Sequence, residues 1–140
     1  MSINITIVFA PDTAVESIPG IADAPTSFDE LASPLGAAQF GSHALLVGDD
    51  ARELALPDGS VIVTLGGTAD VYAVEAPSAG RLRVYSQGEI VEDEGDPSAV
   101  ESVFDEIEDP EDAHIEFVCR LVGITPRELW GAEWFAVEGR

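Results

Sequence analysis

The fold is decided by the stretch VYAVEAPSAGRLRVYSQGEIV, residues 71–91. On both sides of Pro77-Ser78-Ala79-Gly80, apolar side chains alternate with polar or smaller ones, which is the period of a strand with one buried face. The four residues between them are typical of a hairpin turn, and Gln87-Gly88 turns the chain again into a strand at 89–91. Strands joined by short turns pair antiparallel, so this stretch predicts a meander.

Upstream of the meander, four further segments have the composition of strands. Residues 3–8 alternate isoleucine with other side chains, and 43–47 form a short apolar run. Residues 54–56 and 61–65 flank Pro57-Asp58-Gly59, a strong turn signal that predicts another hairpin.

Helix start signals dominate the rest of the chain. Asp96-Pro97 and Asp109-Pro110 each place a capping aspartate before proline, and the second of these helices is expected to stop at Gly123. Thr125-Pro126-Arg127-Glu128 has the capping-box pattern of a further short helix, as does Ser27-Phe28-Asp29-Glu30. The helical spacing after Pro97 is carried by Val100, Val103, Phe104 and Ile107.

These elements predict an α+β protein, with a mostly antiparallel meander sheet and two to three C-terminal helices packed on one face. Residues 134–137 are expected to return as a last strand, and Trp130 and Trp134 to close that end over the core. A chain of 140 residues is the usual size of one domain, so we expect a single acidic α+β domain over 1–140.

Charge is the unusual property of the chain. It has 27 acidic residues against six basic ones, all arginine, and a formal net charge of −21. Such a charge disfavours direct nucleic-acid binding and binding to anionic membranes, because both need a cationic surface. The sequence contains no apolar run long enough to span a membrane, its first residues are typical of a strand and not of a signal peptide, and its single cysteine fits a reducing compartment. We therefore expect a cytoplasmic protein.

The acidic residues are clustered. Thirteen of the 27 lie between Glu89 and Glu116, and no lysine or arginine occurs between Arg83 and Arg120. On the helix expected after Pro97, acids recur at i, i+4 and i+7 opposite the apolar stripe, which predicts a continuous negative surface able to attract a cationic partner. The candidate partner-binding residues are Glu92, Asp93, Glu94, Glu101, Asp105, Glu108 and Asp112.

Patterns of catalytic and metal-binding residues are weak, so we predict no catalytic residues, no cofactor and no metal site. His114 and Cys119 are five residues apart on one helix and therefore diverge, and Cys119 is expected in the core. The acids of 92–96 are adjacent, unlike the alternating ligands of a calcium-binding EF-hand. Arg81 and Arg83 share one strand face, which is expected to be solvated, to hold the acidic segment that follows, or to clamp a carboxylate.

Two segments resemble a group of known proteins. The strand-turn-strand of 81–91, followed by an acidic segment and by Leu121-Val122-Gly123-Ile124-Thr125-Pro126-Arg127-Glu128-Leu129, is similar to small actinobacterial immunity-type and uncharacterised α+β proteins. The resemblance covers about a third of the chain. It implies a non-enzymatic protein that neutralises a toxin or another effector.

Residues and resemblance together predict a non-catalytic acidic protein of the immunity, antitoxin or inhibitor type. Its partner would be a protein with a basic surface, such as a toxin, a nuclease or another effector, whose basic site it occludes. Two alternatives stay open: a nucleic-acid mimic that acts against a defence or nucleic-acid enzyme, and a small-molecule or cation-binding module that uses the acidic loop or the strand face around Arg81, Arg83 and Tyr85.

Overall fold

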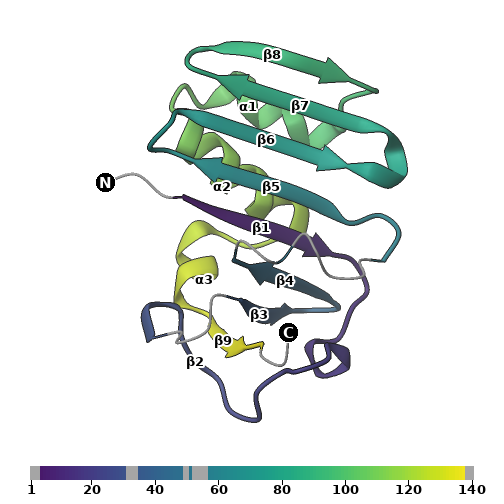
Figure 1. Ribbon diagram of the computed structural model, residues 1–140, viewed down its shortest axis with the longest axis vertical. Coiled ribbons are helices and arrows are strands. Elements are labelled where there is room, and N and C mark those ends of the chain that lie inside the picture. Colours follow the sequence, from purple (N-terminus) through teal and green to yellow (C-terminus); the bar gives the residue numbers. More distant parts are fainter. Residues whose placement is uncertain (1–3, 31–34, 49–50, 52–56, 138–140) are drawn as a thin grey trace.

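The computed structural model describes residues 4–30, 35–48, 51 and 57–137. Nine strands within these residues form one antiparallel sheet in the order β2-β9-β3-β4-β1-β5-β6-β7-β8 (Figure 1). The strands are β1 (Asn4–Ala10), β2 (Thr26–Ser27), β3 (Gly36–Phe40), β4 (His43–Val47), β5 (Val61–Gly66), β6 (Val71–Ala76), β7 (Arg81–Ser86), β8 (Glu89–Glu94) and β9 (Glu133–Ala136).

The helical elements are short except for one. Only α2 exceeds two turns among the described residues, and short 3-10 helices, labelled η, connect several strands. The helical elements are η1 (Val15–Ser17), η2 (Phe28–Glu30), η4 (Pro77–Ala79), η5 (Ala99–Ser102), α1 (Val103–Glu106), α2 (Pro110–Val122) and α3 (Pro126–Gly131).

The central strand β1 is buried on both faces over its second half. Ile7 and Phe9 belong to a core cluster that also contains residues of α1, α2 and α3, whereas Val8 and Ala10 belong to a second cluster with Val15 of η1. Alternate residues of a strand point to opposite faces, so the two clusters lie on opposite sides of the sheet. The alternation over residues 3–8 predicts a half-buried strand with Val8 on its open face. That expectation is wrong, because Val8 is fully buried by the loop after β1, which covers the second face.

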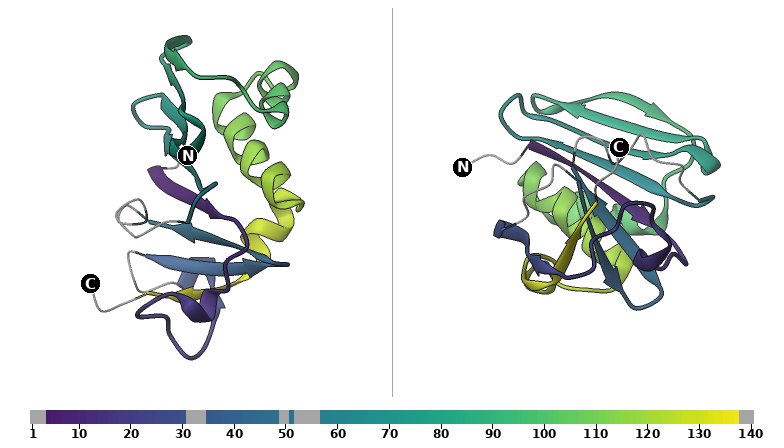
Figure 2. Two further views of the ribbon diagram at one scale, coloured as in Figure 1. Left: turned by 90° about the vertical axis from the view of Figure 1, so that its right-hand side faces the viewer. Right: turned by 60° about the horizontal axis from the view of Figure 1, so that its bottom comes forward.

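Helix α2 packs on the sheet across β1, β5 and β6, and the left view of Figure 2 shows it beside the sheet. It buries Phe117, Val118 and Cys119 in the larger cluster. The α+β class and the antiparallel sheet predicted from the sequence are confirmed, as is the hairpin β6–β7 followed by β8.

The helix caps predicted for α2 and α3 are confirmed. Asp109 Oδ2 accepts a hydrogen bond from the Asp112 amide at 2.9 Å, and Gly123 follows the helix with a φ of 89°. Thr125 and Glu128 form the predicted capping box. Each of these signals acts within one helical turn, so the sequence alone suffices to find it.

The helix prediction after Pro97 is wrong. Ser98, not Asp96, is the N-cap there, and the continuous helix expected is a 3-10 turn followed by four α-helical residues. The short helix expected after Ser27 is a 3-10 helix that begins at Phe28, directly after the two-residue strand β2. The end of that helix at Pro34, the strand expected at 54–56 and residue 3 lie outside the described residues.

The C-terminal aromatic residues pack as expected. Trp134 is fully buried, and Phe28 contacts both Trp130 and Trp134 with ring centroids 5.0 and 5.6 Å apart. Strand β9 lies between β3 and β2, so the C-terminal strand shares one end of the sheet with residues 26–27 and 36–40.

Candidate functional site

Strand β8 forms one border of the sheet (Figure 1). All six of its residues are exposed, and within the described part of the chain it pairs only with β7. Ile90 and Val91 are 44% and 56% exposed, and they are the large apolar side chains that the described residues leave most open to solvent. A strand border of this kind presents backbone hydrogen-bonding groups to solvent.

A β-bulge in β8 arranges its acidic residues. Glu94 pairs with Leu82 and Glu92 pairs with Val84. The register then shifts between Val84 and Tyr85, and as a result Glu89 is the residue that pairs with Ser86. Leu82, Val84 and Ser86 alternate along β7 and share one face, so their three partners on β8 share that face too. We call Glu89, Glu92 and Glu94 the acidic edge.

The opposite face of β7 holds a buried ion cluster. The side chains of Arg81 and Glu101 are only 5% and 8% exposed, and they join through two hydrogen bonds, Nε to Oε2 at 2.9 Å and Nη2 to Oε1 at 2.6 Å. Arg81 also donates to the Asp93 carboxylate and to the Glu94 carbonyl oxygen at 3.0 Å. Hydrogen bonding to Glu101 is the main reason why the pKa of Arg81 is raised.

This cluster corrects two interpretations of the sequence. The face of Arg81 and Arg83 is covered by η5 and α1 and is not a solvated outer face. Glu101 points inward to Arg81 and is withdrawn from the exposed acidic surface on which the sequence pattern placed it. The contacts bear out for Arg81, but not for Arg83, the expectation that these arginines hold the acidic segment that follows.

Arg83 lies beside this cluster. Its guanidinium carbon sits 3.9 Å from the centroid of the Phe104 ring, a cation–π geometry. Its Nη1 atom is buried and has no hydrogen-bond acceptor in the described part of the protein. Burial lowers the pKa of Arg83, and the adjacent Arg81 charge adds to that effect.

A groove of about 480 Å³ runs between β7–β8 and the segment that follows β8. Its lining combines the charged side chain of Arg83 with the apolar side chains of Phe104 and Ile90 and with the carboxylates of Asp93 and Asp105. The other lining residues are Arg81, Pro97, Ser98, Ala99, Glu101 and Ser102.

The remaining predicted partner-binding residues lie apart from the acidic edge. Asp105 is exposed on α1, Glu108 follows the end of α1, and Asp112 is exposed in the first turn of α2. Desolvation, followed by the charge of Asp109, raises the pKa of Asp112. Because α1 ends at Glu106, the i, i+4, i+7 row of one helix does not form.

Arginine side chains from other elements also form ion pairs with residues of the acidic segment. Arg120 on α2 pairs with Glu106 at 3.1 Å and with Glu116 at 3.0 Å, and its hydrogen bonds, followed by its charge, lower the pKa of Glu106. The sequence suggested an acidic stretch free of cations, but arginines distant in the sequence neutralise several of its members. By contrast, the carboxylates of the acidic edge have no ion-pair partner among the described residues.

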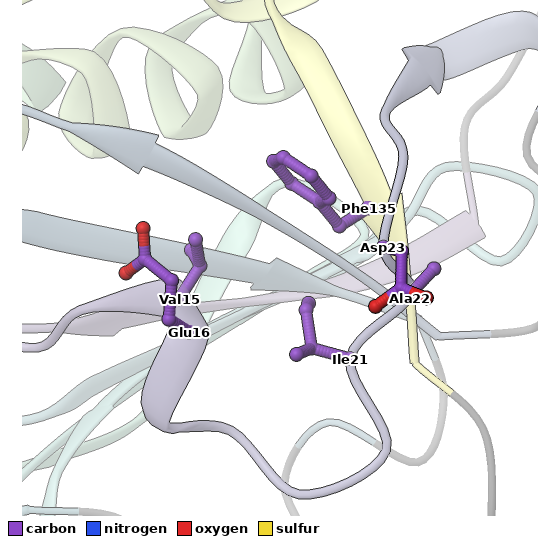
Figure 3. A pocket seen from close by; sticks show the side chains of 6 residues that line it. All are labelled: Val15, Glu16, Ile21, Ala22, Asp23 and Phe135. Atoms are coloured by element: carbon purple, nitrogen blue, oxygen red, sulfur yellow. The ribbon is translucent and has the colours of Figure 1, made fainter.

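A second hollow, of about 430 Å³, lies at the opposite end of the sheet (Figure 3). Ile21 and Phe135 project into it, and Glu16 and Asp23 stand on either side. Val15, which also lines it, is part of the core, so this hollow borders the loop that covers the second face of the sheet.

The side chains best suited to nucleophilic chemistry are buried. Cys119 is fully buried, as predicted, and burial raises the pKa of its thiol to about 12. His114 is 1% exposed, its Nδ1–H donates to the Pro110 carbonyl oxygen at 2.6 Å, and burial lowers its pKa to about 4. His43 accepts a hydrogen bond from the Asp12 amide at 3.0 Å. In residues 4–30, 35–48, 51 and 57–137, no group of His, Cys, Asp and Glu side chains is arranged to hold a metal ion.

The fold and the site define an α+β protein with a fully antiparallel sheet, a bulged acidic border strand and a groove beside it. Comparisons with protein-family models, with curated proteins and with solved structures found no match to this chain. None of the helices in the described residues is both long enough and apolar enough to cross a membrane.

One residue of the acidic edge, Glu89, was not predicted from the sequence. It was not among the candidate residues, and strict alternation from Glu92 and Glu94 would place its side chain on the opposite face. The bulge reverses that relation. The one local signal was the pair Ile90-Val91, two adjacent apolar residues that interrupt the alternation of β8.

Proposed function

We propose that the protein is a non-catalytic acidic protein that binds a basic site on a protein partner and occludes it, in the manner of an immunity, antitoxin or inhibitor protein. The acidic edge carries this proposal. Three glutamates stand on one face of a border strand, in fixed register and without a cation beside them among the described residues. Such an arrangement costs stability through like-charge repulsion, and a basic partner surface would relieve that repulsion on binding.

The contacts of the neighbouring charges support a specific surface over general acidity. Glu101, Asp93, Glu106 and Glu116 are each satisfied by an arginine within the molecule. No arginine neutralises the acidic edge among the described residues. Arg81 lies on the adjacent strand, but its side chain is on the other face of the sheet. The burial of Cys119 and His114 in the core agrees with a role that does not depend on nucleophilic catalysis.

A matched pair of triple variants tests the proposal. Glu89→Gln, Glu92→Gln and Glu94→Gln together remove three charges from the acidic edge. Glu16→Gln, Asp23→Asn and Glu133→Gln remove three charges from exposed positions elsewhere and serve as the control. A partner is recovered from a lysate of the source cells on the wild-type chain, and its association rate with each variant is measured at low and high salt.

We expect the edge variant to associate more slowly and with a weaker salt dependence, because peripheral charges act mainly on the association rate. The control should behave as the wild type does. If the association rate falls equally in both variants, the effect is due to net charge. If the kinetics are unchanged in both variants, the acidic edge is a solvated surface that does not contribute to binding. Either result contradicts the proposal.

A further inference from the structure

Strand β8 is open to the addition of another strand. It is hydrogen-bonded to β7 on one side, and in the described part of the chain no strand pairs with its other side. Six residues of strand span about 20 Å, which is enough to pair with an extended peptide segment. Proteins often bind peptides in this way, with the main chain supplying affinity and alternate side chains supplying specificity.

Charge decides which segment fits. A second copy of this chain would bring its own acidic edge against Glu89, Glu92 and Glu94, and like charges placed directly opposite are destabilising. The acids and the bulge therefore protect the border from self-association. A strand with lysine or arginine on the matching face would form cross-strand pairs with the same three glutamates.

The groove decides what the other face of that strand carries. It lies beside β8 on the side opposite the acidic edge, and Ile90, Phe104 and Arg83 are among the residues that line it. Side chains on one face of an added strand would enter this groove, whereas those on the other face would meet the glutamates. The apolar side chains of Ile90 and Phe104 favour aliphatic side chains, and the carboxylates of Asp93 and Asp105 disfavour acidic ones.

We infer that the partner contributes an extended segment that adds to β8 as a further strand, with basic residues over the acidic edge and aliphatic residues in the groove. This inference rests on the proposed function and specifies its binding mode. It requires both backbone pairing and alternation of side chains, which a purely electrostatic contact does not.

Synthetic peptides separate these requirements. The probe is an acetylated and amidated octapeptide of alternating Lys and Val, and its control has the same composition in two blocks, four Lys followed by four Val. Two further peptides carry N-methyl groups on either the Lys amides or the Val amides of the alternating sequence, which blocks one hydrogen-bonding edge at a time. Affinities for the full chain are measured by fluorescence anisotropy, and sedimentation of the chain alone reports on self-association.

Strand addition predicts that the alternating peptide binds at least about tenfold tighter than the block peptide, since each backbone hydrogen bond adds to affinity. At least one of the two methylated peptides should lose that advantage. On the protein side, Ile90→Ala should weaken binding of the alternating peptide, because Ile90 lines the groove, whereas Val91→Ala on the same strand is the matched control.

The outcomes distinguish the two proposals. Strand addition is refuted if three results occur together: the block and alternating peptides bind equally, neither methylation changes the affinity, and only the triple variant of the acidic edge weakens binding. In that case the proposed acidic binding function still stands. If the edge variant and its control bind every peptide as the wild type does, the proposed function fails as well. Dimers of the chain that Ile90→Ala dissolves would instead identify a second copy as the occupant and overturn the inference.

Discussion

The substitution Glu101→Gln tests the buried ion cluster most directly. The two carboxylate oxygens of Glu101 accept hydrogen bonds from Arg81 at 2.6 and 2.9 Å, and Oε2 is 3.4 Å from the Ser98 amide nitrogen. Glutamine keeps the shape, but it removes the charge and turns one acceptor into a donor that faces an arginine N–H group. Arg81 stays buried, with Asp93 as its remaining carboxylate partner.

The expected loss of stability is large for a single conservative change. Removing one partner of a buried ion pair commonly costs about 3–5 kcal/mol, because the other charge is left uncompensated. Asp93 is 61% exposed and retains part of the compensation, so we expect about 3 kcal/mol. Domains of this kind have a total free energy of unfolding of about 5–15 kcal/mol, so the variant should fold but be clearly weakened.

Urea unfolding followed by tryptophan fluorescence measures this loss. With a urea m-value of about 1–3 kcal/mol/M, the midpoint should fall by about 1 M or more. Glu108→Gln is the control, since it removes the same charge from an exposed position and should change the free energy of unfolding by less than about 0.5 kcal/mol. If Glu101→Gln and Glu108→Gln shift the midpoint equally, the pair contributes no more than a surface charge and the reasoning is refuted.

Three further predictions concern buried or strained positions. The pKa of His114 is about 4 in the folded chain, against an ordinary value of 6.5. As the pH falls, the unfolded chain therefore binds a proton at this residue before the folded chain does. The free energy of unfolding should fall by up to about 3 kcal/mol between about pH 6.5 and pH 4. His114→Phe should lack this component, and the difference between the unfolding curves of wild type and variant at neutral and acidic pH isolates it; parallel losses in both chains would contradict it. Cys119, fully buried with a raised pKa, should react with a disulfide reagent only at the rate of unfolding, and rapid labelling of the native chain would show that the thiol is accessible. Gly95 has a φ of 78°, and a Cβ at this residue would lie 2.9 Å from the Gly80 carbonyl carbon. Gly95→Ala should therefore lower the free energy of unfolding by more than about 1 kcal/mol. A thermal or urea melt measures this loss, and an unchanged midpoint would contradict the predicted strain.

The elements that could be found from the sequence are those whose causes are local. The caps at Asp109 and Thr125 act over three residues, and the turn at 77–80 joins strands that are neighbours in the chain. The α+β class follows from these elements. In 96–107 the only start signal predicted was Asp96-Pro97, but Ser98 is the N-cap, in a capping box with Glu101. The pairing of Glu101 with Arg81 accompanies that choice, and it depends on a residue 20 positions away.

The tertiary structure decided which of the acidic residues are available to a partner. Composition alone determines that this protein is strongly acidic, and the spacing of its apolar residues determines an antiparallel sheet with helices after it. Neither property says which carboxylates an arginine neutralises, because Arg81 and Arg120 reach their partners only after the strands and helices have packed. Nor does alternation reveal the acidic edge, since a bulge reverses the direction of every side chain on one side of it, and its presence is settled by pairing with β7.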